Sequence, residues 1–223
     1  EETVALAEKW FSPIPCRHVA RRSLPMEPVQ TEERRLSVER NVPVDALYMA
    51  FHMCARNHPD YYAFDMLSDL LSSGRSSRFV QHLVQEKQVF NSIDAYISGS
   101  IDEGLFHIVG KPVPEVTLEE AERAVWEELA LLTEGCIDEN ELEKVKNRYE
   151  SEQIFNNLNY LNVATNLAYF ELIGKAEDIN TEVEKYRSVT REQIKEAAKR
   201  TFLPGNCSVL YYKAAAKDAS RTP

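Results

Sequence analysis

The chain has 223 residues, a length that fits one large domain or two small ones. Hydrophobic residues make up 43% and charged residues 28%, a composition typical of folded globular proteins and not of disordered ones. The 36 acidic residues outnumber the 26 lysines and arginines, so the formal net charge is −10. This charge argues against nucleic acid as a partner, because binding to a phosphate backbone depends on cationic side chains.

Several common site motifs are missing from the sequence. The seven glycines contain no G-x-G-x-x-G spacing, and the pair that is five apart, Gly99 and Gly104, precedes leucine where a P-loop has lysine. The four cysteines form no C-x-x-C pair and have no histidine at zinc-ligand spacing. No apolar stretch is long enough for a membrane span, and Glu1-Glu2-Thr3 does not resemble a signal peptide, so neither is predicted.

The first third of the chain is predicted to hold two helices and two strands. Apolar residues recur at helical spacing over 3–11, and several prolines then mark an irregular connector. Residues 34–40 alternate with a period of two, and residues 46–54 form a run with few charges, so both are predicted to be strands. A second helix is predicted over 61–73, with Asp60 as its N-cap and Gly74 at its end.

The middle of the chain is predicted to hold a short helix and a hairpin. The helix begins at Ser76 or Ser77 and ends near Lys87. The hairpin consists of strands over 92–98 and 105–111, joined by a loop from Gly99 to Gly104.

The last part is predicted to be mainly helical, over 118–134, 138–173 (bent or broken near 156–162), 177–187 and 191–201. Three capping-box patterns precede these helices: Thr117-x-x-Glu120, Asp138-x-x-Glu141 and Thr190-x-x-Gln193. A last strand over 207–213 leads into a polar tail. Early strands, late helices and one returning strand predict an α+β domain, with helices on one face of a mainly antiparallel sheet.

The residues alone reveal no complete catalytic site. Neither H-E-x-x-H nor H-x-x-E-H occurs, and a zinc enzyme needs three protein ligands. His82 and Glu86 are expected to form a surface pair, and His52 and His107 to be ordinary strand residues. The nucleophile elbow G-x-S-x-G is also absent. The acidic residues of 118–134, from Glu119 to Glu128, are expected to form the solvated face of a helix, and Cys54 and Cys207 to be buried.

One segment is specific enough to indicate a family. Residues 70–87, LLSSGRSSRFVQHLVQEK, resemble the L-x-x-G-x-S-S-R-L-x-x-x-L-R-E-K signature of the pitrilysin, insulinase and mitochondrial processing peptidase family of inverted-motif zinc peptidases. Residues 3–15 (TVALAEKWFSPIP), the pair of Asp94-Ala95-Tyr96 with 104–108 (GLFHI), and 188–202 (SVTREQIKEAAKRTF) are similar to further family segments, in the family's order.

The resemblance implies a half-clamshell α+β domain. Members of the family are built from paired halves that enclose a chamber, and only one half carries His-x-x-Glu-His and a distal Glu. This chain resembles the other half. The resemblance therefore implies no cofactor in this chain and zinc in a partner half, on the same or another polypeptide, with an extended peptide as substrate. It also predicts the domain limits: 1–30 as the end of the preceding half and a connector, 31–213 as the C-terminal domain, and 214–223 as a polar tail.

The family's substrate-contact residues are not all present. The non-zinc half often supplies an arginine and a tyrosine, spaced R-x6-Y, that hold the substrate backbone. Their places are occupied here by Gln85 and Ser92, and Asn91 is a further polar candidate. Tyr96 comes too late to be the motif tyrosine and is expected on a sheet face, whereas Arg78 is expected to anchor nearby carbonyl or carboxylate groups.

Two functions remain open from the sequence. The first is the non-catalytic half of a zinc metalloendopeptidase, which closes the chamber and contacts extended peptide, for which an exposed strand edge offers backbone hydrogen bonds. The alternative is a proteolytically inactive structural or interaction subunit of the same fold, which the missing arginine and tyrosine favour. On either reading the chain alone is expected to be inactive.

Overall fold

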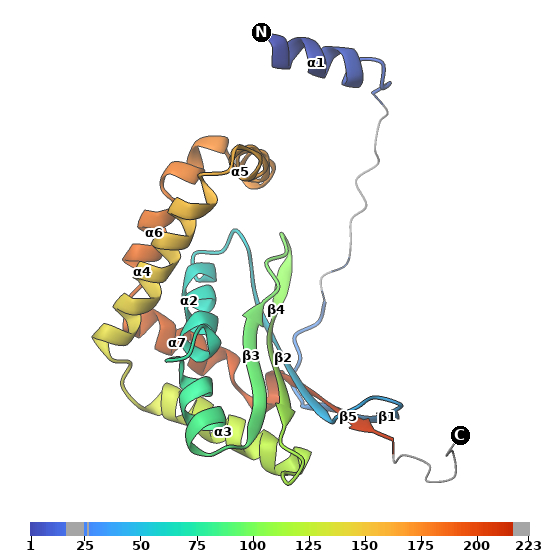
Figure 1. Ribbon diagram of the computed structural model, residues 1–223, viewed down its shortest axis with the longest axis vertical. Coiled ribbons are helices and arrows are strands. Elements are labelled where there is room, and N and C mark those ends of the chain that lie inside the picture. The colour runs from blue at the N-terminus through green and yellow to red at the C-terminus, as the bar shows by residue number, and fades with distance from the viewer. Residues whose placement is uncertain (17–24, 26, 216–223) are drawn as a thin grey trace.

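The computed structural model describes residues 1–16, 25 and 27–215, and its elements follow the predicted order closely. Figure 1 shows their arrangement. The strands are β1 (Arg34–Arg40), β2 (Ala46–Ala55), β3 (Phe90–Ile97), β4 (Glu103–Pro112) and β5 (Cys207–Ala214). The α-helices are α1 (Glu2–Phe11), α2 (Tyr61–Ser72), α3 (Leu118–Glu134), α4 (Glu139–Asn156), α5 (Tyr160–Ile173), α6 (Glu182–Ser188) and α7 (Arg191–Thr201). The π-helix η1 (Phe79–Glu86) and two short 3-10 helices, η2 (Ala176–Asn180) and η3 (Pro204–Asn206), complete the set.

The five strands form one sheet in the order β1-β5-β2-β4-β3. β5 is parallel to β1, and the other neighbours are antiparallel. The last strand of the chain therefore lies between the first two, which ties the end of the domain to its beginning. Helices α2, α3 and α7 lie along one side of this sheet (Figure 1). The predicted α+β class, mainly antiparallel with helices on one face, is confirmed.

Alternation along the strands separates the side chains into two sets. One set faces the helices and forms the core, with Leu47, Phe51, Phe106 and Ile108 completely buried. The other set lies on what we call the open face, the side of the sheet away from α2, α3 and α7. The register of the strands places on the open face Arg34, Leu36, Val38, Tyr48, Ala50, His52, Ser92, Asp94, Tyr96, Leu105, His107, Val109, Lys111, Ser208, Leu210 and Tyr212.

Two of the three predicted capping boxes are formed. The Thr117 and Thr190 hydroxyls accept hydrogen bonds from the backbone N–H groups of Glu120 and Gln193, whose side chains bond back. The third predicted capping box, between Asp138 and Glu141 at the start of α4, is not formed. Asp138 caps the helix by accepting from the Asn140 N–H, because the Glu141 carboxylate is bound by Arg78 instead.

Asp60 occupies the N-cap position of α2 but does not cap the helix. Its backbone is already in the helical region, with φ −74° and ψ −10°, whereas a capping side chain needs an extended backbone to reach the first N–H groups. The Asp60 carboxylate accepts a hydrogen bond from Arg200 of α7 instead. The helix ends as predicted before Gly74, whose φ of +89° is one that glycine tolerates best.

Four further expectations need correction or limits. The helix near 77–87 is a π-helix, η1, which buries Phe79 and Leu83 with wider turns than the predicted α-helix. The predicted helix over 177–187 is divided into η2 and α6, whereas 138–173 is divided into α4 and α5 as expected. Cys207 is buried but Cys54 only half-buried. Most of the predicted polar tail, 216–223, lies outside the described residues.

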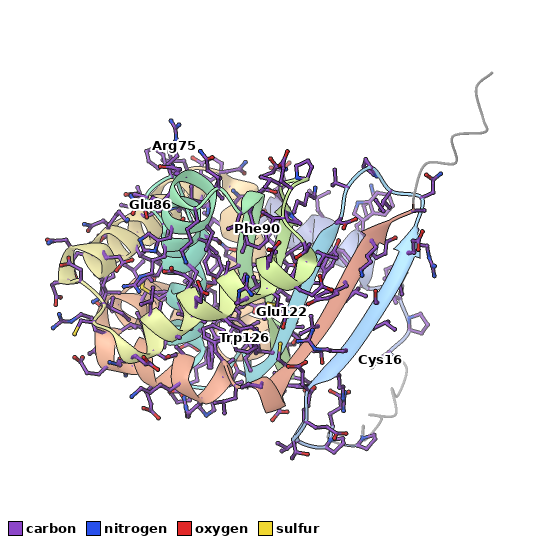
Figure 2. The ribbon with its side chains drawn as sticks, turned by 90° about the horizontal axis from the view of Figure 1, so that it is seen from below. Cys16, Arg75, Glu86, Phe90, Glu122 and Trp126 are labelled. Atoms are coloured by element: carbon purple, nitrogen blue, oxygen red, sulfur yellow. The ribbon has the colours of Figure 1, made fainter. Side chains whose placement is uncertain are left out.

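The expectation that the acidic residues of α3 are solvated is wrong for two of them. Glu122 and Glu128 are buried, with 5% and 1% of their surface exposed. Glu122, seen with Trp126 in Figure 2, binds both terminal nitrogens of Arg35 at 2.8 and 2.5 Å. It also accepts from the Tyr211 hydroxyl at 2.6 Å and the Trp126 Nε1–H at 3.1 Å. Burial opposes the ionisation of Glu122, but these hydrogen bonds outweigh it and hold its pKa below the ordinary value.

Replacing Glu122 therefore tests how strongly α3 is fixed to the sheet. Glu122→Ala leaves three donors on β1, β5 and α3 without their acceptor, and we expect it to lower the free energy of unfolding by about 2–3 kcal/mol. The exposed Glu119 of the same helix provides the control, because Glu119→Ala is expected to change stability by no more than about 0.5 kcal/mol. Urea denaturation measures both, and equal effects of the two variants would contradict the assignment.

Candidate substrate-contact surface

The three residues predicted to contact substrate do not gather at one point. Gln85 lies exposed on η1, where its amide makes only a long hydrogen bond of 3.4 Å to the Arg75 carbonyl. Asn91 and Ser92 lie at the beginning of β3, and no hydrogen bond joins either of them to Gln85 among the described residues. The structure thus separates the position of the family's arginine, on a helix, from that of its tyrosine, on the sheet.

Asn91 and Ser92 differ in what their side chains can do. The pairing of β3 with β4 shifts between Phe90 and Ser92, so Asn91 is the extra residue of a β-bulge. Its amide donates to the Pro112 carbonyl at 3.2 Å, which makes it part of the bulge. Ser92 is exposed on the open face opposite Lys111. Of the predicted residues, Ser92 is therefore the one on the open face with its polar group available.

Tyr96 lies on the open face, as predicted for a sheet residue. Its ring, about half exposed, stacks on His107 of β4 with ring centroids 4.9 Å apart and an interplanar angle of 20°. Burial lowers the pKa of His107, so the histidine of this pair is neutral at neutral pH. The pair gives the open face a rigid aromatic element.

The outer edge of β3 is partly closed to a further strand. The Ser72 hydroxyl of α2 accepts a hydrogen bond from the Ala95 N–H and donates one to the Ala95 carbonyl, both at 2.9 Å. These are the backbone groups that an added strand needs at that point. In the part of the chain that the structure describes, no hydrogen bond reaches the outer edge of β1 between Arg34 and Val38. The edge that remains free is therefore that of β1.

Arg78 has the anchoring role that its place in the family motif suggests. Its guanidinium binds both oxygens of Glu141 on α4 at 2.9 Å and reaches the Cys136 carbonyl at 3.4 Å. Both side chains are mostly buried. Arg78 thus fastens the beginning of η1 to α4.

His82 is paired with a residue that the sequence pattern does not indicate. Helical spacing predicts a contact with Glu86 four residues on, but the His82 Nδ1 lies 2.9 Å from Oε1 of Glu128 on α3. The other oxygen of Glu128 is buried and has no hydrogen-bond partner among the described residues. Glu128 is 46 residues from His82 in sequence, so helical spacing gives no signal for this contact.

The described residues do not fit a zinc ion. No group of three or more histidine, cysteine, aspartate or glutamate side chains comes together at metal-binding distance within them. His18 lies outside the described residues. None of the described helices combines the length and apolar character needed to cross a membrane.

The strongest electrostatic perturbations lie between helices and away from the open face. The buried Arg56 at the end of β2 forms a 2.5 Å ion pair with the buried Glu182 of α6. On α2, burial raises the pKa of Asp65, which accepts a hydrogen bond from the Tyr186 hydroxyl. Burial, assisted by the charge of Asp65, raises the pKa of Asp69 to about 6. The Arg56–Glu182 pair joins the end of β2 to α6, and the Asp65–Tyr186 hydrogen bond joins α2 to α6, so these groups serve the packing of α6.

Comparison with known proteins identifies the family. A family model described as "Peptidase M16 inactive domain" matches residues 1–149, about two-thirds of the chain. The chain belongs to the peptidase M16 inactive-domain family. The family resemblance of residues 70–87 is thereby confirmed.

The most informative relatives are bacterial. Over 131 residues, which is 58% of this chain and 30% of the relative, the M16 domain is 28% identical to the zinc protease PqqE of Helicobacter pylori. The crystal structure of a protease from H. pylori superposes with a TM-score of 0.85 at 21% identity, covering 95% of this chain and 52% of that one. An M16 inactive domain from Pseudomonas fluorescens has a TM-score of 0.81 at 16% identity, covering 96% and 51%. The chain thus spans about half the length of the two solved structures and less than a third of PqqE.

The raised pKa of Asp69 predicts an unusual dependence of stability on pH. The folded chain keeps the Asp69 proton to about pH 6, whereas the unfolded chain releases it near the ordinary value of 3.8. Ionisation of Asp69 therefore lowers stability as the pH rises between these values, and the loss persists above about pH 6. We expect Asp69→Asn to raise the free energy of unfolding by about 2 kcal/mol at about pH 8 and to leave it nearly unchanged at about pH 4.

The exposed Asp94 supplies the matched control for this pH dependence. Asp94→Asn is expected to change stability by less than about 0.5 kcal/mol at either pH. Chemical denaturation across the pH range measures both variants. A gain for Asp69→Asn that is the same at both ends of the range would contradict a raised pKa at Asp69.

Proposed function

We propose that this chain is the half of a zinc metalloendopeptidase that does not hold the metal. It closes the chamber and contacts extended peptide, while another half, on the same or a partner polypeptide, holds zinc and activates water. The proposal assigns this chain binding and positioning and assigns the chemical step to the other half. Membership of the inactive-domain family and the relatives' greater length support it.

The open face is the observation that carries this proposal. The described helices cover one side of the sheet, and the other side carries large apolar side chains that are well exposed: Leu36 at 61%, Tyr96 at 49% and Tyr48 at 39%. Large apolar side chains that stay exposed on a sheet face are a feature of interaction sites. We therefore propose that the open face lines the chamber.

Contact with peptide is proposed for the residues that the family pattern picks out. Ser92 is on the open face and can exchange hydrogen bonds with a peptide backbone. Gln85 can donate one neutral hydrogen bond, which is weaker than the charge-assisted contact of an arginine. Asn91 contributes by keeping the bulge that positions Ser92. Because Ser72 closes the edge of β3 at Ala95, we propose backbone pairing, where it occurs, at the edge of β1.

The second candidate is an inactive subunit that holds a partner protein. The observation in its favour is that Gln85 and Ser92 stand where active members have arginine and tyrosine. The two candidates differ in the nature of the other half. A half that carries His-x-x-Glu-His supports the peptidase, and one that lacks the motif supports the structural subunit.

The first test concerns zinc and hydrolysis. After incubation with zinc and desalting, we expect elemental analysis of the purified chain to find far less than about one zinc per chain, and the chain alone to leave extended peptides intact, because three ligands are needed for such a site. Mixing with the cognate zinc-bearing half is expected to produce hydrolysis. One tightly held zinc in this chain, or a zinc-bearing half that is equally active without it, would contradict the proposal.

The second test concerns α1, which we propose packs against the zinc-bearing half. α1 buries no residue, and Val4, Leu6, Trp10 and Phe11 are 51–69% exposed. Phe11→Ala is expected to leave the free energy of unfolding of this chain within about 0.5 kcal/mol but to weaken its affinity for the zinc-bearing half about tenfold. Glu8→Ala on the same helix is the control and should leave both unchanged. An unchanged affinity of Phe11→Ala, measured by titration calorimetry, would exclude α1 from that interface.

A further inference from the structure

The open face carries two adjoining hollows where β1 and β5 meet β2 and β4. The first, which we call the open-face pocket, has a volume of about 330 Å³, and its walls on this face include Arg34, Leu36, Tyr48, His107, Val109 and Leu210. The second, the hairpin groove, has a volume of about 930 Å³ and extends to the loop between β3 and β4. The two share Arg34, Ala50 and Ser208, so Arg34 lies at their junction.

The strand register explains why there is a hollow at this place. Across the sheet, Arg34, Ser208, Ala50 and His107 follow one another on β1, β5, β2 and β4. Two small side chains thus lie between two large ones, which leaves space above the centre of the row. In the next row, Leu36, Leu210, Tyr48 and Val109 form a continuous apolar wall. A volume of this size is in the range of small-ligand pockets and accepts one bulky side chain.

The walls of the open-face pocket are held in place by aromatic contacts. Tyr48 meets Tyr212 edge to face, with ring centroids 6.3 Å apart and an interplanar angle of 82°. His107 is stacked on Tyr96 and, because its pKa is lowered by burial, adds no charge at neutral pH. Rigid walls reduce the entropy cost of binding, so the open-face pocket is suited to a ligand as it stands.

Charge in and around the open-face pocket is strongly asymmetric. Arg34 lines it and makes no hydrogen bond or ion pair among the residues that the structure describes. The neighbouring Arg35 points to the other side of the sheet and is bound to Glu122. Among the described residues no carboxylate lines the open-face pocket, whereas Glu27, Asp102 and Glu103 line the hairpin groove. In a chain of net charge −10, an unpaired guanidinium beside an apolar hollow favours an anionic ligand.

We propose that the open-face pocket binds a peptide segment in which a bulky apolar side chain stands next to a carboxylate. The apolar side chain occupies the hollow between Leu36, Tyr48 and Val109. The carboxylate, either the C-terminus of the peptide or an acidic side chain, binds Arg34. The carboxylates of the hairpin groove repel further negative charge on that side. This inference rests on the proposed function, in which the open face contacts peptide, and it names the peptide chemistry that is recognised.

Binding to the 223-residue chain can be measured with two pairs of short peptides by titration calorimetry. The first pair is N-acetyl-Ala-Ala-Phe with a free C-terminal carboxylate and the same peptide as its amide. The second is N-acetyl-Ala-Phe-Glu-Ala amide and its glutamine twin. We expect the charged member of at least one pair to bind about tenfold more tightly than its neutral twin, since a charge-assisted contact is lost in the twin. The pair that shows the difference identifies the source of the carboxylate.

Variants assign the preference to individual residues. Arg34→Gln is expected to remove the difference between charged and neutral peptides, and Arg34→Lys to retain part of it, because lysine keeps the charge but not the forked geometry. Tyr48→Ala is expected to weaken both members of a pair equally. Arg75→Gln is the matched control: Arg75 lies on the loop after α2, far from β1 in the view of Figure 2, and its replacement should change nothing. Thermal unfolding confirms that each variant is folded.

Three results would overturn the inference. They are equal binding of charged and neutral peptides, a preference for the carboxylate that survives in a folded Arg34→Gln variant, and failure of the parent chain to bind any of the four peptides at millimolar concentration. The test is independent of hydrolysis. If the preference for a carboxylate depends on Arg34 but the chain does not support cleavage with a zinc-bearing half, the proposed ligand of the open-face pocket is supported and the peptidase role is rejected. If cleavage occurs without this preference, the peptidase role is supported and the proposed ligand is rejected.

Discussion

The structure depends on one constraint: a five-stranded sheet against which α2, α3 and α7 all pack on the same side. The last strand, β5, lies between β1 and β2, so the sheet is complete only when the end of the chain has returned to its beginning. The buried set that includes Leu47, Phe51 and Phe106 then packs against helices, while none of the described helices covers the open face. Leu36, Tyr48 and Tyr96 of the open face are exposed, and in the proposed assembly the other half covers them.

The two adjacent arginines of β1 show how alternation divides stability from binding. Successive side chains of a strand point to opposite faces, so Arg35 faces α3 and Arg34 faces the open-face pocket. Arg35 satisfies the buried carboxylate of Glu122 and is satisfied by it. Arg34 has no such partner in the described part of the chain. A shift of β1 by one residue would turn Arg34 toward α3 and Arg35 toward the open face. The contact of Arg35 with Glu122 therefore also fixes the register of this edge strand.

Most of the fold could be predicted from the sequence, because its signals are local. Period-two and helical spacing predict the strands and most helices, and the capping boxes predicted at Thr117 and Thr190 are confirmed. Signals that depend on distant partners could not be read. Glu122 and Glu128 look like any solvated glutamate of an amphipathic helix, because their partners Arg35 and His82 are 87 and 46 residues away. Ser92 could be placed on a sheet face by alternation, but the open-face pocket could not, since it requires β5 beside β2.

Gln85 stands at the position of the family's arginine, whereas an arginine of this chain, Arg34, lies on the open face. A non-zinc half without the family's arginine has two alternatives. It binds peptide through other side chains, or it holds a partner protein and binds no peptide. Gln85 is exposed on η1 and offers a neutral amide, while Arg34 offers a full charge beside an apolar hollow. In the proposed binding mode, electrostatic attraction to Arg34 and burial of one apolar side chain act on neighbouring atoms of the same peptide. On this proposal the position of Arg34 on the sheet, more than the identity of the residue at the motif position, determines where this chain contributes a positive charge.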